Sequence, residues 1–138
     1  MNYGFVKVAA AVPHVKVADC FYNIQQIEGL MRQASQKEVQ IIAFPELSVT
    51  SYTCMDLFSQ ETLLRNAEKA LLDLVNNTAD LDLLTIVGCP LVSGSQLINA
   101  AVAFQRGEIL GCPRATCPAT KSSKKSVGSR PLHTYSNP

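Results

Sequence analysis

The chain has 138 residues, a hydrophobic content of 47% and a formal net charge of +1. This length suits a single domain with one modest core, and so small a net charge gives no general attraction to nucleic acid or to an anionic membrane. The charge is unevenly divided, because residues 1–111 contain seven basic and eleven acidic residues, whereas residues 112–138 contain five basic residues and no acid. The two parts are therefore expected to behave differently.

The composition also indicates where the protein is located in the cell and whether it contains disulfides or a metal site. No apolar run reaches the roughly 20 residues of a membrane-spanning helix, and the first residues lack the pattern of a signal peptide, so a cytoplasmic protein is expected. The five cysteines are odd in number and irregularly spaced, which favours thiols over a disulfide framework. Cys112 and Cys117 have no second Cys or His pair at compatible spacing, so no metal site is expected.

The first part of the chain predicts a strand, a helix and a second strand. Residues 5–12 (FVKVAAAV) are expected to form a strand that Pro13 ends. Asp19 is a suitable N-cap for an amphipathic helix, whose apolar face is marked by Cys20, Ile24, Ile27, Met31 and Ala34. Residues 39–44 (VQIIAF) predict a short apolar strand of the kind that is covered on both faces. This order favours a parallel strand pair with a right-handed crossover, and ligands are expected at the carboxyl ends of such strands.

The next elements predict a second helix, a third strand and a hairpin. The helix should end near the polar cluster NNTAD (76–80), and its apolar face is marked by Leu63, Ala67, Ala70, Leu71, Leu74 and Val75. Residues 83–92 predict the third strand, and residues 100–111 predict a strand, an RGE turn and the start of its return partner. The fold class is therefore α/β, in the order strand, helix, strand, helix, strand and β-hairpin.

The segment FPELSVTSY (44–52) places Glu46 directly after a buried strand and a proline. A carboxylate there needs a partner or a chemical role, because an uncompensated buried charge is costly to desolvate. The segment resembles the first catalytic motif of the nitrilase, or carbon–nitrogen hydrolase, superfamily. Its continuation TSYTCMDLF (50–58) is similar to the N-terminal glutaminase domain of glutamine-dependent NAD synthetases. The resemblance covers residues 3–111 and implies the first half of a four-layer α-β-β-α sandwich.

The resemblance also implies roles for individual residues. A glutamate, a lysine and a cysteine cooperate in this family, and Glu46 matches the glutamate that moves protons. If the motif stood alone, a carboxylate that caps a loop or pairs with an arginine would be favoured, but the surrounding match reverses that preference. Tyr52 matches a tyrosine that lines the glutamine pocket, although a half-buried tyrosine with a hydrogen-bonded hydroxyl is an equal alternative. Asp56 is expected to cap a short helical turn. Cys54 matches no nucleophile motif and receives no catalytic role, and Cys89 is expected to be a buried small residue.

The sequence departs from the family pattern after Gly111, where a segment V-P-K-x-Y-L-P carrying the catalytic lysine would follow. Residues 112–138 lack periodicity, hold four of the seven prolines and predict a disordered basic tail. Regrouping the codons allowed for residues 111–129, so that each new codon starts on an old third base, permits VPKSYLPGDKEFEEKRWF. We interpret the tail as an out-of-frame reading of the family sequence. The chain alone then holds a base without its lysine and cysteine, and is expected to be inactive.

The expected function is hydrolysis of the glutamine side-chain amide, which supplies ammonia for ATP-dependent NAD synthesis. ATP would be used by a synthetase domain absent from this chain, no cofactor is expected in this portion, and the full-length protein is expected to form a homo-oligomer. Two alternatives stay open: another carbon–nitrogen hydrolase that acts on a different amide or nitrile, and a non-catalytic α/β module whose basic tail binds a partner.

Overall fold

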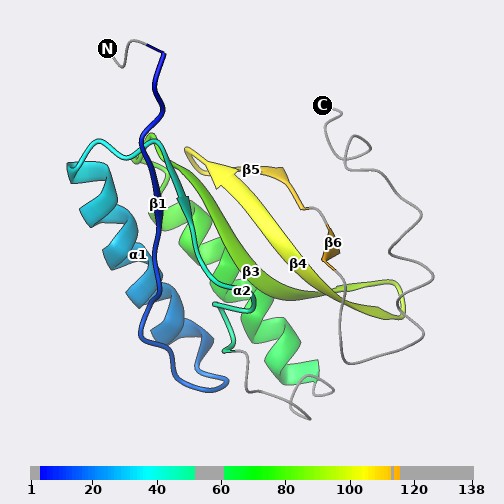
Figure 1. Ribbon diagram of the computed structural model, residues 1–138. Helices are drawn as coiled ribbons and strands as arrows, with labels where there is room; N and C mark the ends of the chain where they lie inside the picture. The colour runs from blue at the N-terminus through cyan, green and yellow to red at the C-terminus, as the bar shows by residue number, and fades with distance from the viewer. Residues whose placement is uncertain (1–3, 52–60, 113, 116–138) are drawn as a thin grey trace.

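The computed structural model describes residues 4–51, 61–112 and 114–115. Its elements follow the predicted order of strand, helix, strand, helix, strand and hairpin (Figure 1). They are β1 (Val8–Ala10), α1 (Cys20–Gln36), β2 (Ile41–Ala43), α2 (Glu61–Asn77), β3 (Leu84–Ser93), β4 (Gln96–Gln105), β5 (Glu108–Gly111) and β6 (Arg114–Ala115). The α/β class is confirmed. Neither helix of this described part combines the length and apolar character that a bilayer crossing requires.

The strands form one six-stranded sheet in the order β1-β2-β3-β4-β5, with β6 beside β4. β1, β2 and β3 are parallel, as predicted for the first pair, and β4 and β5 continue the sheet in antiparallel pairing. β4 and β5 meet at Arg106 and Gly107, which both have positive φ, as a two-residue hairpin turn requires. The short β6 lies in the segment that was expected to lack structure.

The first two strands are shorter than the apolar runs that predicted them. β1 pairs with β2 only from Val8 to Ala10, opposite Ile41 to Ala43, so Phe5 and Val6 lie outside the ladder and are 80% and 57% exposed. The length of a strand depends on where its partner runs alongside it. An apolar run in the sequence indicates that a segment is extended. It does not indicate where the partner strand begins and ends, and so it does not predict the length of the paired strand.

The two helices pack against each other and on one face of the sheet (Figure 1). The Asp19 carboxylate accepts a hydrogen bond from the Tyr22 backbone N–H at 3.1 Å, which confirms the predicted N-cap. All the apolar positions predicted for the two helix faces are buried. They meet alternate residues of the strands, among them Val87 and Phe104, which are almost fully buried. Each such large side chain contributes roughly 1.5–3 kcal/mol on burial.

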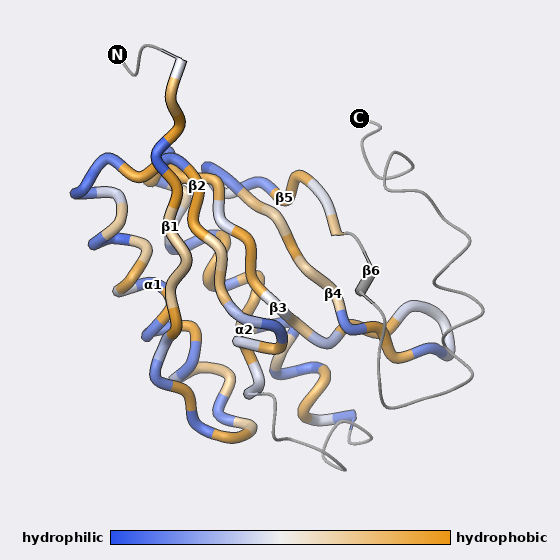
Figure 2. Tube along the Cα trace, viewed as in Figure 1, coloured by the Kyte–Doolittle hydropathy of each residue, from blue (hydrophilic) through white to orange (hydrophobic). Residues whose placement is uncertain are grey.

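The opposite face of the sheet, here called the open face, is apolar but is covered by neither helix. Figure 2 shows that apolar residues run along β1, β2 and β3. The open face consists of alternate strand residues that are partly or fully exposed: Val8, Ala10, Ile41, Ala43, Leu84, Ile86, Ala101 and Ala103. One helix layer and one sheet with an apolar open face correspond to the predicted first half of a four-layer sandwich, because in that architecture a second sheet packs on this face.

Candidate active site

Glu46 lies in a tight turn that follows the carboxyl end of β2; residues 44–51 are called the Glu46 turn. Hydrogen bonds join this turn to β3, because the Phe44 N–H donates to the Ile86 carbonyl at 2.9 Å and the Val49 N–H donates to the Gly88 carbonyl at 3.1 Å. The Gly88 N–H in return donates to Ser48 Oγ at 3.3 Å. The turn is buried from residue 47 to residue 51, whereas the Glu46 side chain is exposed. A buried frame thus presents one accessible carboxylate.

Gly88 allows the Glu46 turn to lie directly on the sheet. A Cβ atom at this position would stand 2.2 Å from the Leu47 backbone nitrogen and 2.8 Å from the Glu46 carbonyl carbon. Real Cβ atoms do not approach backbone atoms so closely, so only glycine leaves the necessary room. Its partner on β4 is Ala101, which is also small. Glycine is required at position 88 because a larger residue would push the Glu46 turn away from the sheet. The absence of a side chain therefore fixes how close Glu46 lies to β3.

The backbone on the carboxyl side of Glu46 is strained. Leu47 and Ser51 have φ values of +53° and +77°, in the left-handed region that side chains disfavour. Such residues cost about 1–3 kcal/mol each and persist only where the surrounding structure holds them. The Leu47 side chain is 8% exposed, and the Ser51 N–H donates to the Leu47 carbonyl at 2.8 Å. Strain of this kind is concentrated at functional sites, which supports a chemical role for this turn.

Asn23 on α1 clamps the Glu46 turn from the helix side. Its Nδ2 donates to the Val49 and Lys16 carbonyls, both at 2.9 Å, and its Oδ1 accepts from the Lys16 N–H at 2.7 Å. The side chain is completely buried. One buried amide therefore joins the helix, the loop before it and the turn after β2, and each of its atoms is paired as burial demands.

Replacing Asn23 by alanine is expected to lower the free energy of unfolding by about 3 kcal/mol, because two carbonyls and one N–H lose a buried partner. Urea unfolding measures this effect. The matched control is Gln25→Ala on the exposed face of the same helix, which should change stability by less than about 0.5 kcal/mol. Equally small effects in both variants would contradict the clamp.

Asn99 on β4, for which the sequence predicted no role, is the partner of Glu46. Its Nδ2 donates a hydrogen bond to Glu46 Oε1, and its side chain is 3% exposed. It lies on the open face opposite Pro90 of β3. The available signal was one amide within the apolar segment LINAAVAF, since a polar residue in such a strand needs a partner. The chain alone does not say which partner it is.

The structure thus places Glu46 at the strand end where it was predicted, although it does not test its catalytic role. Tyr52, the predicted glutamine-binding residue, lies outside the described residues, as do Cys54 and Asp56. Within the described ranges, no group of three or more His, Cys, Asp or Glu side chains could hold a metal ion.

Cys89 is completely buried against α2, as predicted, and its environment keeps it protonated. Burial, with smaller contributions from Cys20, Cys112 and Glu68, raises the pKa of the Cys89 thiol far above its usual range. Only the thiolate is an effective nucleophile, so Cys89 is a packing residue.

Alkylation provides a direct check of this assignment. Cys89 is expected to stay unmodified when the folded chain is treated with iodoacetamide near neutral pH, and to react fully in concentrated urea, because unfolding exposes the thiol and restores its ordinary pKa. Peptide mapping by mass spectrometry reads each cysteine separately. Rapid labelling of Cys89 in the folded chain would contradict both the burial and the protonation state.

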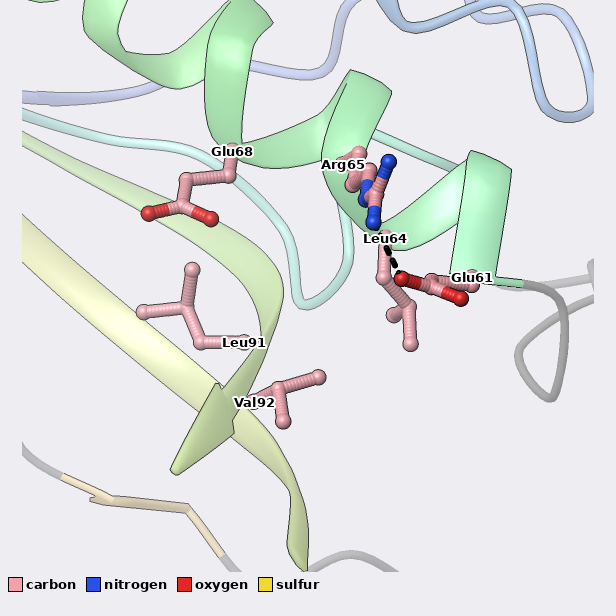
Figure 3. A pocket seen from close by; sticks show the side chains of 6 residues that line it. All are labelled: Glu61, Leu64, Arg65, Glu68, Leu91 and Val92. Carbon is pink, nitrogen blue, oxygen red and sulfur yellow. Dashed lines mark hydrogen bonds and ion pairs between the residues drawn. The ribbon is translucent and has the colours of Figure 1, made fainter. Parts of the chain in front are cut away.

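A shallow cleft lies elsewhere, where the first turns of α2 pass the end of β3 (Figure 3). Its lining consists of Glu61, Leu64, Arg65 and Glu68 from α2 and Leu91 and Val92 from β3. Glu61 and Arg65 form an ion pair, but both side chains are 77% exposed, so the pair contributes little. The cleft does not include Glu46 or Asn99, and we assign the chemistry to the Glu46 turn.

The fold agrees with comparisons to known proteins. Residues 7–126 match the family described as Carbon-nitrogen hydrolase. The chain belongs to the carbon–nitrogen hydrolase family. The matched range spans the Glu46 turn, Gly88 and Asn99.

Among characterised relatives, the glutamine-dependent NAD(+) synthetase of Mycobacterium bovis is 36% identical over 110 residues, which cover 80% of this chain and 16% of that protein. The enzyme of the same name from Aquifex aeolicus is 37% identical over 95 residues, which cover 69% of this chain and 16% of that protein. The chain therefore spans about one sixth of the length of these relatives.

Solved structures confirm the fold. A glutamine-dependent NAD(+) synthetase from Cytophaga hutchinsonii superposes with a TM-score of 0.75 at 20% identity, over 81% of this chain and 19% of that one. An amidase from Nesterenkonia sp. superposes with a TM-score of 0.67 at 17% identity, over 86% of this chain and 46% of the amidase. At these identities the likeness shows the nitrilase-like fold alone.

Proposed function

We propose that residues 1–111 are the first part of a glutaminase domain, which hydrolyses the side-chain amide of glutamine and supplies ammonia for NAD synthesis. The observation that carries this proposal is the Glu46 carboxylate, presented by a buried and strained turn and hydrogen-bonded to a buried amide. The curated relatives named above support the choice of glutamine. ATP would be consumed by a synthetase domain that lies beyond this chain.

The chemistry proposed for Glu46 is proton transfer. The carboxylate takes the proton of a cysteine thiol, and the thiolate attacks the amide carbon to form a tetrahedral oxyanion. Glu46 then returns the proton to the nitrogen as the carbon–nitrogen bond breaks, so ammonia leaves and a thioester remains. Finally Glu46 takes a proton from water, which attacks the thioester, and glutamate and the thiol are released.

Two further groups are needed, and we propose that both come from family sequence that would follow Gly111. A positive charge or fixed donors must hold the oxyanion, and a cysteine must supply the thiol. The Nesterenkonia amidase has an active-site cysteine, to which acrylamide is attached by Michael addition in one variant, and this supports the choice of a cysteine. We accordingly propose that the 138-residue chain by itself does not hydrolyse glutamine.

The tail after Gly111 forms the second part of this proposal. We propose that residues 112–138 are read out of frame from the family sequence, in which PKSYLP would supply the lysine. Sequencing the coding DNA together with peptides across Gly111 tests this. A coding sequence that encodes CPRATCPATK in a single intact frame would overturn it.

A substrate comparison tests the glutaminase proposal in the full-length protein that carries residues 1–111. We expect NAD formation from nicotinate-adenine dinucleotide with either glutamine or ammonium as the nitrogen source, and ammonia release from glutamine in preference to simple amides and nitriles. Preference for a simple aliphatic amide would favour the amidase alternative. Ammonia release from none of these compounds would favour a non-catalytic module.

A further inference from the structure

The Asn99 side chain is only partly satisfied. Its Nδ2 donates to Glu46, but its Oδ1 is buried and has no hydrogen-bond partner among the residues that the structure describes. Asn23, the other fully buried amide of the described chain, has every polar atom paired. Buried polar atoms in native proteins nearly always have a partner. An unpaired oxygen beside a candidate catalytic group therefore indicates a hydrogen-bond donor that the substrate or another part of the complete domain supplies.

The orientation of the Asn99 amide follows from its neighbour. An ionised carboxylate only accepts hydrogen bonds, so the NH2 group must face Glu46 and the carbonyl oxygen must point to another group. Within the part of the chain that the structure describes, the strand neighbours of Asn99 have no side-chain donor, since they are Leu97, Ala101, Pro90 on β3 and Ala115 on β6. The unpaired Oδ1 and the Nδ2 that donates to Glu46 therefore belong to one small amide, which can link Glu46 to a second group on the same face.

We propose that Asn99 is a positioning residue with two contacts, in which Nδ2 holds the Glu46 carboxylate and Oδ1 accepts a hydrogen bond from an N–H donor that completes the site. The donor is either the carboxamide of the substrate or an ammonium side chain from the rest of the domain. This inference rests on the proposed glutaminase function. It gives Glu46 a fixed direction although its own side chain is exposed.

Two substitutions of similar size separate this role from packing. Asn99→Asp keeps the shape and an oxygen in place of Oδ1, but replaces the donor by a like charge beside Glu46. Asn99→Leu fills a similar volume and has neither donor nor acceptor. The matched control is Thr85→Val, at a buried polar residue of β3 whose hydroxyl donates to the Leu83 carbonyl at 3.4 Å. Glutaminase kinetics are measured in the full-length protein, with ammonia-dependent NAD synthesis as the internal reference.

We expect both Asn99 variants to lose about 100-fold in kcat for glutamine, the size of effect that follows when a catalytic group is misplaced by about 1 Å. Ammonia-dependent synthesis and Thr85→Val should stay within about twofold of wild type. If the substrate supplies the donor, the KM for glutamine rises in Asn99→Leu but not in Asn99→Asp. If a protein ammonium group supplies it, KM is unchanged in both variants.

An Asn99→Asp protein with near wild-type kcat would overturn the proposal, because shape alone would then suffice. This outcome is distinct from failure of the proposed function, which would show as an unmodified full-length protein that releases no ammonia from glutamine. Should the variants fold poorly, a crystal structure of the unmodified full-length protein with glutamine bound still decides. Oδ1 within hydrogen-bond distance of an N–H group supports the role, and an Oδ1 without any donor overturns it.

Discussion

Replacing Glu46 by glutamine is expected to lower glutamine-dependent NAD formation by about 10²- to 10⁴-fold in the full-length protein, the usual contribution of a general acid–base group. Glutamine has nearly the size of glutamate, and its carbonyl oxygen can still accept the hydrogen bond from Asn99 Nδ2. It cannot, however, take a proton from a thiol. NAD formation with ammonium should be unchanged, because that reaction bypasses amide hydrolysis.

The control for this prediction is a charge removal elsewhere on the surface. Glu61→Gln removes an exposed carboxylate at the start of α2, where it pairs with the solvent-exposed Arg65, and should leave both activities within about twofold, since exposed pairs contribute little. Assays with glutamine and with ammonium are run on the same preparations. Equal loss of both activities in Glu46→Gln would mean that the substitution disturbs the protein generally, and the proposed role would be wrong.

Replacing Gly88 by alanine is expected to displace the Glu46 turn. The new Cβ would stand 2.2 Å from the Leu47 nitrogen and 2.8 Å from both the Glu46 carbonyl carbon and the Pro45 oxygen. These are backbone atoms, so the whole turn must move. Overpacking of this kind costs about 1–3 kcal/mol, and a shift of about 1 Å in a catalytic group lowers the rate about 100-fold. We therefore expect lower stability together with loss of glutamine-dependent activity.

Gly29 provides the matched control for Gly88. It lies on the exposed side of α1, and a Cβ there would meet no atom within 4 Å. Because alanine is the better helix former, Gly29→Ala should raise the free energy of unfolding by about 0.5–1 kcal/mol. Urea unfolding of both variants, with glutamine and ammonium assays in the full-length protein, gives the comparison. A Gly88→Ala protein as stable and as active as wild type would contradict the close approach of the turn.

Several local features could be predicted from the sequence because their causes lie close together in the chain. The apolar faces of both helices follow from the helical repeat. The Asp19 carboxylate lies three residues before Tyr22, whose backbone N–H donates a hydrogen bond to it. The hairpin turn at Arg106 and Gly107 lies between two strands that pair with each other. Glu46 could be identified as a candidate because a carboxylate directly after a buried strand needs a partner or a chemical role. Its family motif also occupies nine consecutive residues.

Tertiary contacts decided the rest of the site. Asn99 and Glu46 are 53 residues apart, and Asn23 and Val49 are 26 residues apart, so no local pattern identifies either pair. The lengths of β1 and β2 depend on how far they run side by side, and the need for glycine at position 88 appears only where another backbone crosses it. The sequence alone therefore determined which elements form and which carboxylate is exceptional, because both depend on neighbouring residues. Only the folded sheet decided what holds that carboxylate, because hydrogen bonds and close approaches across strands join residues that the chain keeps far apart.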